Sequence, residues 1–527
     1  MNQEERFQKL PNWIQRTVNF LKKIHVPAKM VYIMISVLAT IWFLFRVIPK
    51  PSRAAYPCMQ VAAPLMSGFI VWIIAFSGTA FAFRKAKQRW MKARYIAAIL
   101  FLLAGTGAAF LMLPELTTDA KAGSKTLDIW YKPNMPVGEA RGIFPGRVLW
   151  GHNPEIASWD GKTGSWWEDQ YNDQKEVDKL LNQTLTGLTE AKNESKAWDA
   201  LFRHFNKIKR NQNRGYKPGE KIAIKINENN TYSHENNDEI NANPHLILSL
   251  LRSLVNEAEI AQENITVTDP SRFITDNIFK KCHAEFPSVH YVDHEGGDGR
   301  EKALFVENAI PYSVNNGKVA TGLATCIVEA DYIISMALMK GHVSQGVTLS
   351  AKNYFGCTSI EADWRKNSHS SGFSQNQDGS HKYLVFTDFL GHKDLGEKTM
   401  LFLIDGIYSN KFVDKVPAFK WTLPPFDNQW PCSLFASQDG VAVDAVVLDF
   451  IIEEWPDAPD MMYSDYYLTE SALAGNPPSG TFYDPERDGS RLESLGVMEH
   501  WNNAIDKQYS RNLHTGDGIE LIYRKIN

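Results

Sequence analysis

Cysteine is scarce in this chain of 527 residues, which holds five cysteines and no C-x-x-C pair. An iron–sulfur cluster or a zinc ribbon held by cysteines alone is therefore not expected. The sequence also lacks three common motifs: G-x-x-x-x-G-K-[ST], G-x-G-x-x-G and G-x-S-x-G. Their absence argues against a P-loop nucleotide hydrolase, a dinucleotide-binding enzyme with the usual fingerprint and a serine hydrolase.

An excess of positive charge is missing as well. Lysine and arginine total 56 against 60 acidic residues, which gives a formal net charge of −4. No basic stretch is interleaved with aromatic residues, so we expect no nucleic-acid partner. The chain is longer than one ordinary domain, and its composition, 44% hydrophobic and 22% charged, is that of a globular protein.

Long apolar runs are concentrated at the start of the chain. Residues 30–45, 54–83 and 95–114 carry no charged side chain. A helix that crosses a bilayer needs about 20 apolar residues, so these runs predict three transmembrane helices within a membrane anchor, residues 1–115. None of the three has an ionisable residue in its middle, which favours a plain anchor over a transport pathway. Residues 116–140 are polar and are expected to form a linker.

Lysine and arginine predict the orientation of this anchor. They are most frequent before the first span and in the link 84–94, between the second and third spans. Positively charged segments stay in the cytoplasm, which places the N-terminus there and residues 141–527 on the outer side of the inner membrane. The membrane is then one partner, and the spans leave room for an inner-membrane protein or a quinone as another.

Strand and helix patterns alternate through the C-terminal part. Strands are expected up to Asn227, at 265–268 and at 289–292, with helical periodicity between them, and 319–329 is expected to be helical. This rhythm predicts an α/β domain over residues 141–527, with a mostly parallel sheet and crossover helices. In such sheets the strands end at a common edge, where ligands usually bind.

The stretch 339–356, MKGHVSQGVTLSAKNYFG, follows an apolar run at 331–337 that is typical of a buried strand. It carries Lys340, His342 and Lys352 in a glycine-containing loop, and these are the predicted catalytic residues. The two lysines are suited to hold a carboxylate or phosphate. The histidine is the best candidate for a general acid or base, because imidazole titrates near neutral pH. The alternative is a surface loop with solvated lysines.

Other polar residues stand near the ends of the expected strands or in the same stretch. The predicted substrate-binding residues are Asn227, Asp269, Arg272, Asn353 and Asp405. A divalent metal is compatible with these side chains, and the candidate metal ligands are His369 and Asp439, although no tight ligand spacing supports them. For Asp444, in the first turn of an expected helix, the helix dipole is a sufficient explanation.

Five motifs carry a resemblance to a known family and span roughly residues 220–455. They are IAIKINEN, VTDPSR, IISMALMKGHVSQGVTLSAKNYFG, LFLIDGIY and SQDGVAVDAVVLDF, in that order. This part of the chain resembles the bacterial and archaeal "domain of unknown function 362" family. The resemblance implies a fold group rather than an activity. Many members carry cysteine-rich ferredoxin-like segments, which this chain lacks.

The block around His342 and Lys352 is also similar to the nickel-pincer lactate racemase group. In that group a lysine anchors a nickel-pincer cofactor, and a histidine lies about ten residues before it, as here. The resemblance implies Lys352 as the anchor and His369 as a further nickel ligand.

Three functions stay open at this point. The first is a membrane-anchored enzyme that acts on a small polar or anionic molecule, with or without a metal. The second is a binding or sensory module that uses the same cleft without turnover. The third is an accessory subunit of an inner-membrane redox or envelope assembly, with the three spans as its contact.

Overall fold

The computed structural model describes residues 132–342, 346–360, 382–456 and 464–526. The chain divides into two compact units, Met1–Ala122 and Gly123–Asn527. The first unit, which contains the three predicted membrane spans, lies outside the described residues. Within the described ranges, no helix combines the length and apolarity that a membrane crossing requires. The last part of the predicted linker is folded, because β1 (Val137–Gly138) pairs with β13 (Val497–Met498).

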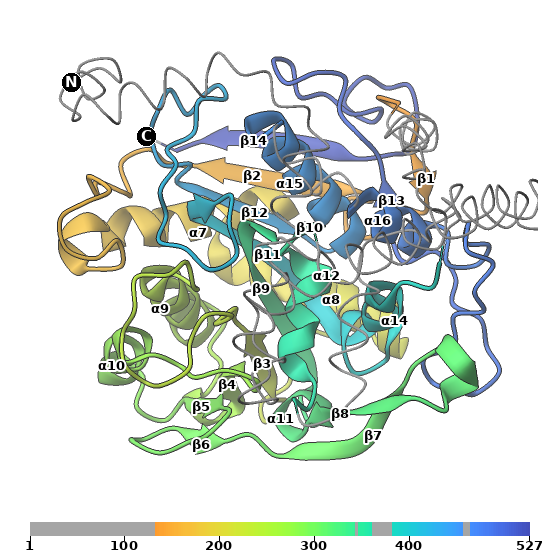
Figure 1. Cartoon of the computed structure of the whole chain (residues 1–527), viewed down its shortest axis with the longest axis horizontal. Helices are drawn as coiled ribbons and strands as arrows, with labels where there is room; N and C mark the ends of the chain where they lie inside the picture. The colour runs from red at the N-terminus through yellow and green to blue at the C-terminus, as the bar shows by residue number, and fades with distance from the viewer. Residues whose placement is uncertain (1–131, 343–345, 361–381, 457–463, 527) are drawn as a thin grey trace, which may run out of the picture. The chain divides into compact units, whose positions relative to one another are not determined.

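A mixed sheet organises the second unit (Figure 1). In spatial order its strands are β14 (Glu520–Lys525), β2 (Arg147–His152), β12 (Ser433–Ser437), β11 (Thr399–Asn410), β9 (Tyr332–His342), β3 (Ile222–Lys225), β4 (Ile265–Asp269), β5 (His290–Asp293) and β6 (Glu301–Lys302). β12 runs antiparallel to both neighbours, whereas the other adjacent pairs on this path are parallel. A further short strand, β10 (Gly346–Val347), pairs with the end of β9. The predicted α/β class with a mostly parallel sheet is therefore confirmed.

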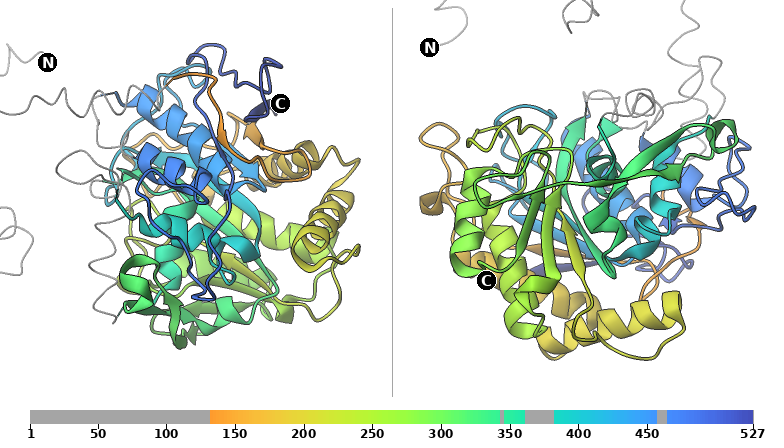
Figure 2. Two further views of the ribbon diagram at one scale, coloured as in Figure 1. Left: turned by 90° about the vertical axis from the view of Figure 1, so that its right-hand side faces the viewer. Right: turned by 90° about the horizontal axis from the view of Figure 1, so that it is seen from below.

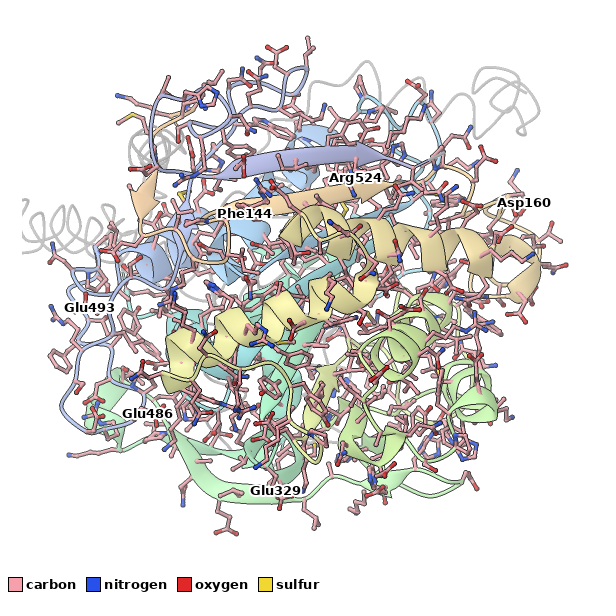
Figure 3. The ribbon with its side chains drawn as sticks, turned by 180° about the vertical axis from the view of Figure 1, so that it is seen from behind. Phe144, Asp160, Glu329, Glu486, Glu493 and Arg524 are labelled. Atoms are coloured by element: carbon pink, nitrogen blue, oxygen red, sulfur yellow. The ribbon has the colours of Figure 1, made fainter. Side chains whose placement is uncertain are left out.

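Helices cover both faces of this sheet (Figure 2). One face, here called the α9 face, carries α7 (Gln174–Thr189), α8 (Glu194–Arg210), α9 (Pro244–Arg252) and α10 (Asp276–Glu285). The opposite α15 face carries α12 (Ser350–Asn353), α14 (Val385–Gly391), α15 (Gly440–Glu454) and α16 (Ser464–Ala472). Figure 3 shows α7 and α8, in yellow, crossing the sheet on the α9 face. Both faces are buried, which explains why the central strands are mostly apolar.

Strand alternation assigns each side chain of a strand to one of these two cores. In β3, Ile222 and Ile224 pack on the α9 face, while Ala223 packs on the α15 face. Successive strand residues point to opposite sides, so Lys225 shares the side of Ala223. A lysine at the end of an apolar strand is thereby directed toward α12, which follows β10 in the chain.

The order in which successive strands are added to the sheet reverses at β3. It runs from β3 through β4 and β5 to β6 on one side, and it then returns through β9 to the other side of β3. The gap between β3 and β9 is therefore a topological switch point. In open α/β sheets, ligands bind beside such points, at the edge where the parallel strands end. We call this edge the carboxyl edge and the opposite one the amino edge.

A correction concerns residues 319–329, which were expected to be helical. Ala320–Ala324 form strand β8, which pairs with β7 (Phe305–Pro311), and only Thr325–Val328 form a short helix, α11. The pairing of β8 with β7 fixes the strand conformation, and the local sequence pattern of residues 319–329 does not reveal this pairing.

Candidate functional site

A cavity of about 290 Å³ opens at the carboxyl edge beside the switch point. Its wall includes Lys225, Asn227, Asp269, Arg272, Lys352 and Asn353. Five of these six residues are predicted site residues, and Lys225 is the addition. They come from the ends of β3 and β4 and from α12, so three segments far apart in sequence converge on one place.

A buried ion pair forms the floor of the site. Lys225 and Asp269 are almost fully buried, and their Nζ and Oδ2 atoms are 3.1 Å apart. Lys225 Nζ also donates to the carbonyl of Ile226 and to Asn353 Oδ1, the latter at 3.1 Å. The Asp269 carboxylate accepts a bond of 2.9 Å from the backbone N–H of Glu228. Buried charges need this kind of pairing, because an isolated one is costly.

Gly356 makes room for this pair. A Cβ atom at Gly356 would lie 2.5 Å from Lys225 Nζ and 2.7 Å from Asp269 Oδ1. Both distances are too short for any side chain, so only glycine fits against the two charged groups.

Asn353 ties the two strands of the switch point together. Its Nδ2 donates to the carbonyl of Lys225 in β3 at 3.1 Å and to Ser335 Oγ in β9 at 3.2 Å. Its Oδ1 accepts from Lys225 Nζ and, at 3.2 Å, from Asn227 Nδ2. All polar atoms of the Asn353 amide are thus used within the protein. Its role is to position Lys225 and Asn227.

Arg272 and Lys352 bring positive charge to the same wall. Arg272 donates from Nε to the carbonyl of Asn229 at 2.8 Å and from Nη1 to that of Ser271 at 2.9 Å. Among the described residues, no carboxylate lies within ion-pair distance of its guanidinium. Lys352 is buried, and its Nζ lies 5.2 Å from the ring centre of Phe355. Carbonyl contacts hold an arginine in place but leave its charge available to an anion.

Lys340 does not line the cavity. Its Nζ donates to the carbonyls of Ile240 at 2.9 Å and Val413 at 3.3 Å, which joins two loops. Burial lowers the pKa of Lys340 to about 7. The neighbouring Glu228 is fully buried, and this burial, followed by the charge of Asp269, raises its pKa well above the usual value. The structure therefore places Lys340 as a buried support for loops near the site.

His342 is the last residue of β9 and is paired with Gly346 of β10. It is buried and is not part of the cavity wall. The predicted grouping of His342 with Lys352 on one cavity wall is therefore not what the structure shows.

Asp405 was expected at the shared edge but lies on the α9 face. Its strand neighbours Leu401 and Leu403 pack in the core of that face. The Asp405 carboxylate accepts from the backbone N–H groups of Asn243 at 3.0 Å and Ile407 at 3.1 Å. Burial raises the pKa of Asp405 to about 6. It anchors the start of α9 instead of facing the cavity.

Asp439 lies at the opposite edge, because β12 runs antiparallel to the strands that form the cavity. As the N-cap of α15, its carboxylate accepts from the backbone N–H groups of Val441 at 3.1 Å and Ala442 at 2.9 Å. It also accepts from the backbone N–H groups of Arg141 at 3.0 Å and Val497 at 3.1 Å. Four backbone donors saturate its oxygens. The structure gives Asp439 a structural role, and the predicted placement with the other site residues is wrong.

The other candidate metal ligand, His369, lies outside the described residues. Within the described ranges, no group of three or more histidine, cysteine, aspartate or glutamate side chains has the geometry of a metal site. Metal binding and the nickel-pincer similarity therefore stay predictions, and no chemistry is derived through either.

Lys225 is the site residue that sequence reasoning missed. The signal was present in the strand IAIKIN, where one lysine interrupts an apolar run. A charged residue in a buried strand needs a partner, and this need is a reason to look for a site.

These features define an open α/β domain with a cationic cavity at its switch point. A model of the family described as "Domain of unknown function (DUF362)" matches residues 222–449. This match supports the resemblance that the motifs indicated, and the matched segment includes both the cavity and the central strands. Neither the curated proteins nor the solved structures gave a significant match.

Proposed function

We propose that the DUF362 domain binds a small anionic molecule in the carboxyl-edge cavity and acts on it as an enzyme. The observation that carries the proposal is the charge of the wall: three cations, Lys225, Arg272 and Lys352, face one carboxylate, Asp269. Asp269 is paired with Lys225, and no carboxylate among the described residues lies within ion-pair distance of Arg272. A carboxylate or phosphate would complete the charge balance that the protein leaves open.

The position of the cavity supports the same proposal. It lies beside the gap between β3 and β9, where open α/β sheets bind their ligands. Its volume, about 290 Å³, is that of a pocket for a small molecule. Surface lysines that serve only solubility would have no reason to converge there in buried positions.

The ion pair suggests how such an enzyme would work. Lys225 Nζ lies on the cavity wall and is held by Asp269 and Asn353. In this position it would stabilise negative charge that develops on a bound substrate, or pass a proton to it, while Asp269 balances the charge. Arg272 and Lys352 would hold the anionic group of the substrate. A binding module without turnover would use the same contacts.

The binding claim is tested by calorimetric titration of the purified full-length chain with malonate and with orthophosphate. We expect saturable binding of at least one anion. The double variant Arg272→Gln, Lys352→Gln should weaken it about a hundredfold, since each charge-assisted contact contributes about tenfold. The matched control is Arg203→Gln, Lys196→Gln on α8, which should leave binding unchanged. Absence of binding, or equal loss in both double variants, would refute the proposal.

We also propose that residues 1–115 anchor this domain to the inner membrane and that the domain lies on the extracytoplasmic side. The support is the three uncharged runs and the distribution of lysine and arginine between them. A tag at the C-terminus should be accessible to protease in intact spheroplasts. Protection of the tag until the cells are lysed would overturn the orientation.

Recovery of a stoichiometric membrane partner would favour an accessory subunit over a self-contained enzyme.

A further inference from the structure

We infer that the anion bound in this cavity carries its own hydrogen-bond donor, and that Asn227 Oδ1 accepts from that donor. This inference rests on the proposed function and narrows its ligand class. The ligand is an oxyanion that keeps one O–H group at neutral pH, of which hydrogen phosphate is the simplest example.

The orientation of the Asn227 amide follows from its neighbour. Asn353 uses both hydrogens of its own amide on Lys225 O and Ser335 Oγ, so its Oδ1 can only accept. Asn227 must therefore turn its Nδ2 toward Asn353 Oδ1, which it does at 3.2 Å. The amide of Asn227 cannot flip without placing two acceptors against each other. Its Oδ1 is thereby fixed as an acceptor.

This acceptor has no partner inside the protein. Asn227 is 6% exposed, and its Oδ1 makes no hydrogen bond among the described residues. Buried polar atoms are almost always satisfied, and an exception calls for a ligand or a trapped water. Because Asn227 lines the cavity, the cavity is the place from which a donor would come.

The other polar groups on the cavity wall further restrict which anion fits. Arg272 and Lys352 can only donate, so they match the ionised oxygens of an anion. Asn227 Oδ1 is a neutral acceptor among these donors. Sulfate has no O–H at neutral pH and would set an oxygen lone pair against this atom. Hydrogen phosphate has the same shape and one O–H, so it can accept from Arg272 and Lys352 and donate to Asn227 Oδ1. Sites built around a buried polar group reject analogues that leave the group unpaired.

The test compares orthophosphate with sulfate in calorimetric titrations of the full-length chain at pH 7.5. We expect orthophosphate to bind about tenfold or more tightly, which is the typical cost of an unpaired buried acceptor. Asn227→Ala should bring the ratio of the two affinities close to one. Asn227→Ser, which keeps an acceptor, should retain part of the preference. Asn213→Ala, at an exposed loop position, is the matched control and should keep the full ratio.

Each outcome separates this inference from the proposed function. Equal affinity for the two anions in the unaltered chain overturns the inference and leaves anion binding intact. Binding of malonate without binding of orthophosphate likewise overturns the inference and leaves anion binding intact. Failure of all three anions to bind overturns both. A preference for orthophosphate that persists in Asn227→Ala overturns the assignment to Asn227. The ratio in the unaltered chain needs no variant, so the inference is testable even if a substitution prevents folding.

Discussion

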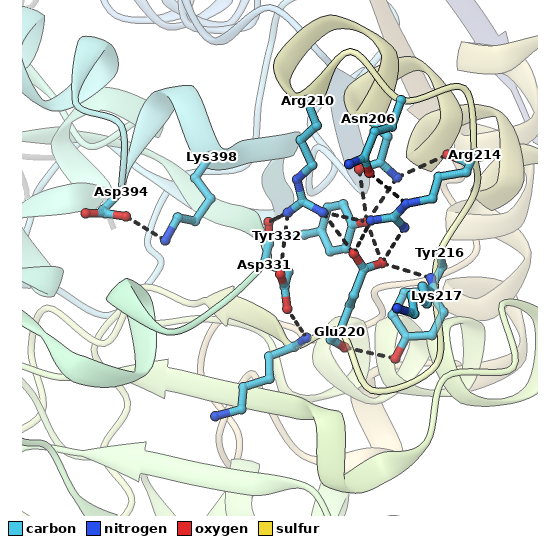
Figure 4. A network of polar contacts seen from close by, with 12 residues as sticks. Asn206, Arg210, Arg214, Tyr216, Lys217, Glu220, Asp331, Tyr332, Asp394 and Lys398 are labelled. Atoms are coloured by element: carbon cyan, nitrogen blue, oxygen red, sulfur yellow. Dashed lines mark hydrogen bonds and ion pairs between the residues drawn. The ribbon is translucent and has the colours of Figure 1, made fainter.

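Charged side chains cluster at both ends of β3, and the two clusters differ in how completely their polar groups are paired within the protein. At the amino edge, Glu220 is shared by Arg210 and Arg214, and it also accepts from the Tyr332 hydroxyl at 2.8 Å (Figure 4). Burial alone would raise the pKa of Glu220, but the hydrogen bonds from Arg214 and Tyr332 lower it to about 2. Every group in this cluster has a partner, and the cluster fastens the start of β3 to α8 and β9.

The carboxyl edge differs in its balance of charge. There Lys225 has a carboxylate partner, but Arg272 is held by backbone carbonyls, and Asn227 Oδ1 has no partner among the described residues. A cluster that served stability alone would resemble the one at the amino edge. Groups that stay unsatisfied in the folded chain are typical of sites whose missing partner is a ligand. One strand therefore carries a structural cluster at its amino edge and a binding site at its carboxyl edge.

The largest effect is expected at the amino edge. Glu220→Gln removes the charge that Arg210 and Arg214 share, and it should lower the free energy of unfolding by about 3 kcal/mol. Anion affinity should not change. Urea unfolding followed by far-ultraviolet circular dichroism measures the first quantity. The exposed Glu329→Gln is the control, with an expected change below about 0.5 kcal/mol. A loss of anion affinity with no loss of stability would reverse the proposed roles of the two edges.

The low pKa of Glu220 predicts a dependence of stability on acid pH. A carboxylate whose folded pKa, about 2, lies below its unfolded value contributes stability that is fully present above the unfolded pKa. That contribution is lost as the pH falls from about 4.5 to about 2. The urea midpoint of the unaltered chain should fall over this window, and Glu220→Gln should flatten the fall. Parallel curves for the two proteins would contradict the assignment.

A smaller loss of stability, with a larger loss of binding, is expected at Gly356. In Gly356→Ala the new methyl group must displace Lys225 and Asp269, which should cost about 2 kcal/mol of stability. Anion binding should become undetectable by calorimetry, because the ion pair forms the floor of the cavity. Gly475→Ala is the matched control, since a Cβ there meets its nearest atom at 3.6 Å. Normal anion affinity in Gly356→Ala would place the ligand elsewhere.

The smallest effect concerns one charge on the cavity wall. Lys352→Gln should weaken malonate or orthophosphate binding about tenfold, which equals about 1.4 kcal/mol. The free energy of unfolding should change by less than about 1 kcal/mol, because glutamine keeps a polar side chain of similar length at this position. Titration and urea unfolding of the same preparation give both values. A stability loss as large as that of Glu220→Gln would make Lys352 a structural residue.

The sequence predicted the parts of the site that depend on local pattern. Strand alternation and strand ends placed Asn227 and Asp269 at one edge, and the glycine-rich stretch placed Lys352 and Asn353 near them. These predictions succeeded because parallel strands end together, whatever their order in the sheet.

The remaining predictions needed information that is not local. The direction of β12 depends on its pairing with β11 and β2, so the edge of Asp439 could not be read from its neighbours. Every residue of β11 is buried, so its sequence does not show which face Asp405 joins. The orphaned oxygen of Asn227 depends on how Asn353 orients, which only the folded structure reveals.

The most direct test of the central claim is a crystal of the full-length chain soaked in arsenate, which scatters anomalously and keeps one O–H at neutral pH. We expect an anomalous difference peak in the carboxyl-edge cavity, in contact with Arg272 and Lys352 and with an oxygen beside Asn227 Oδ1. An empty cavity at saturating arsenate, or a peak only at another place on the molecule, would contradict the account.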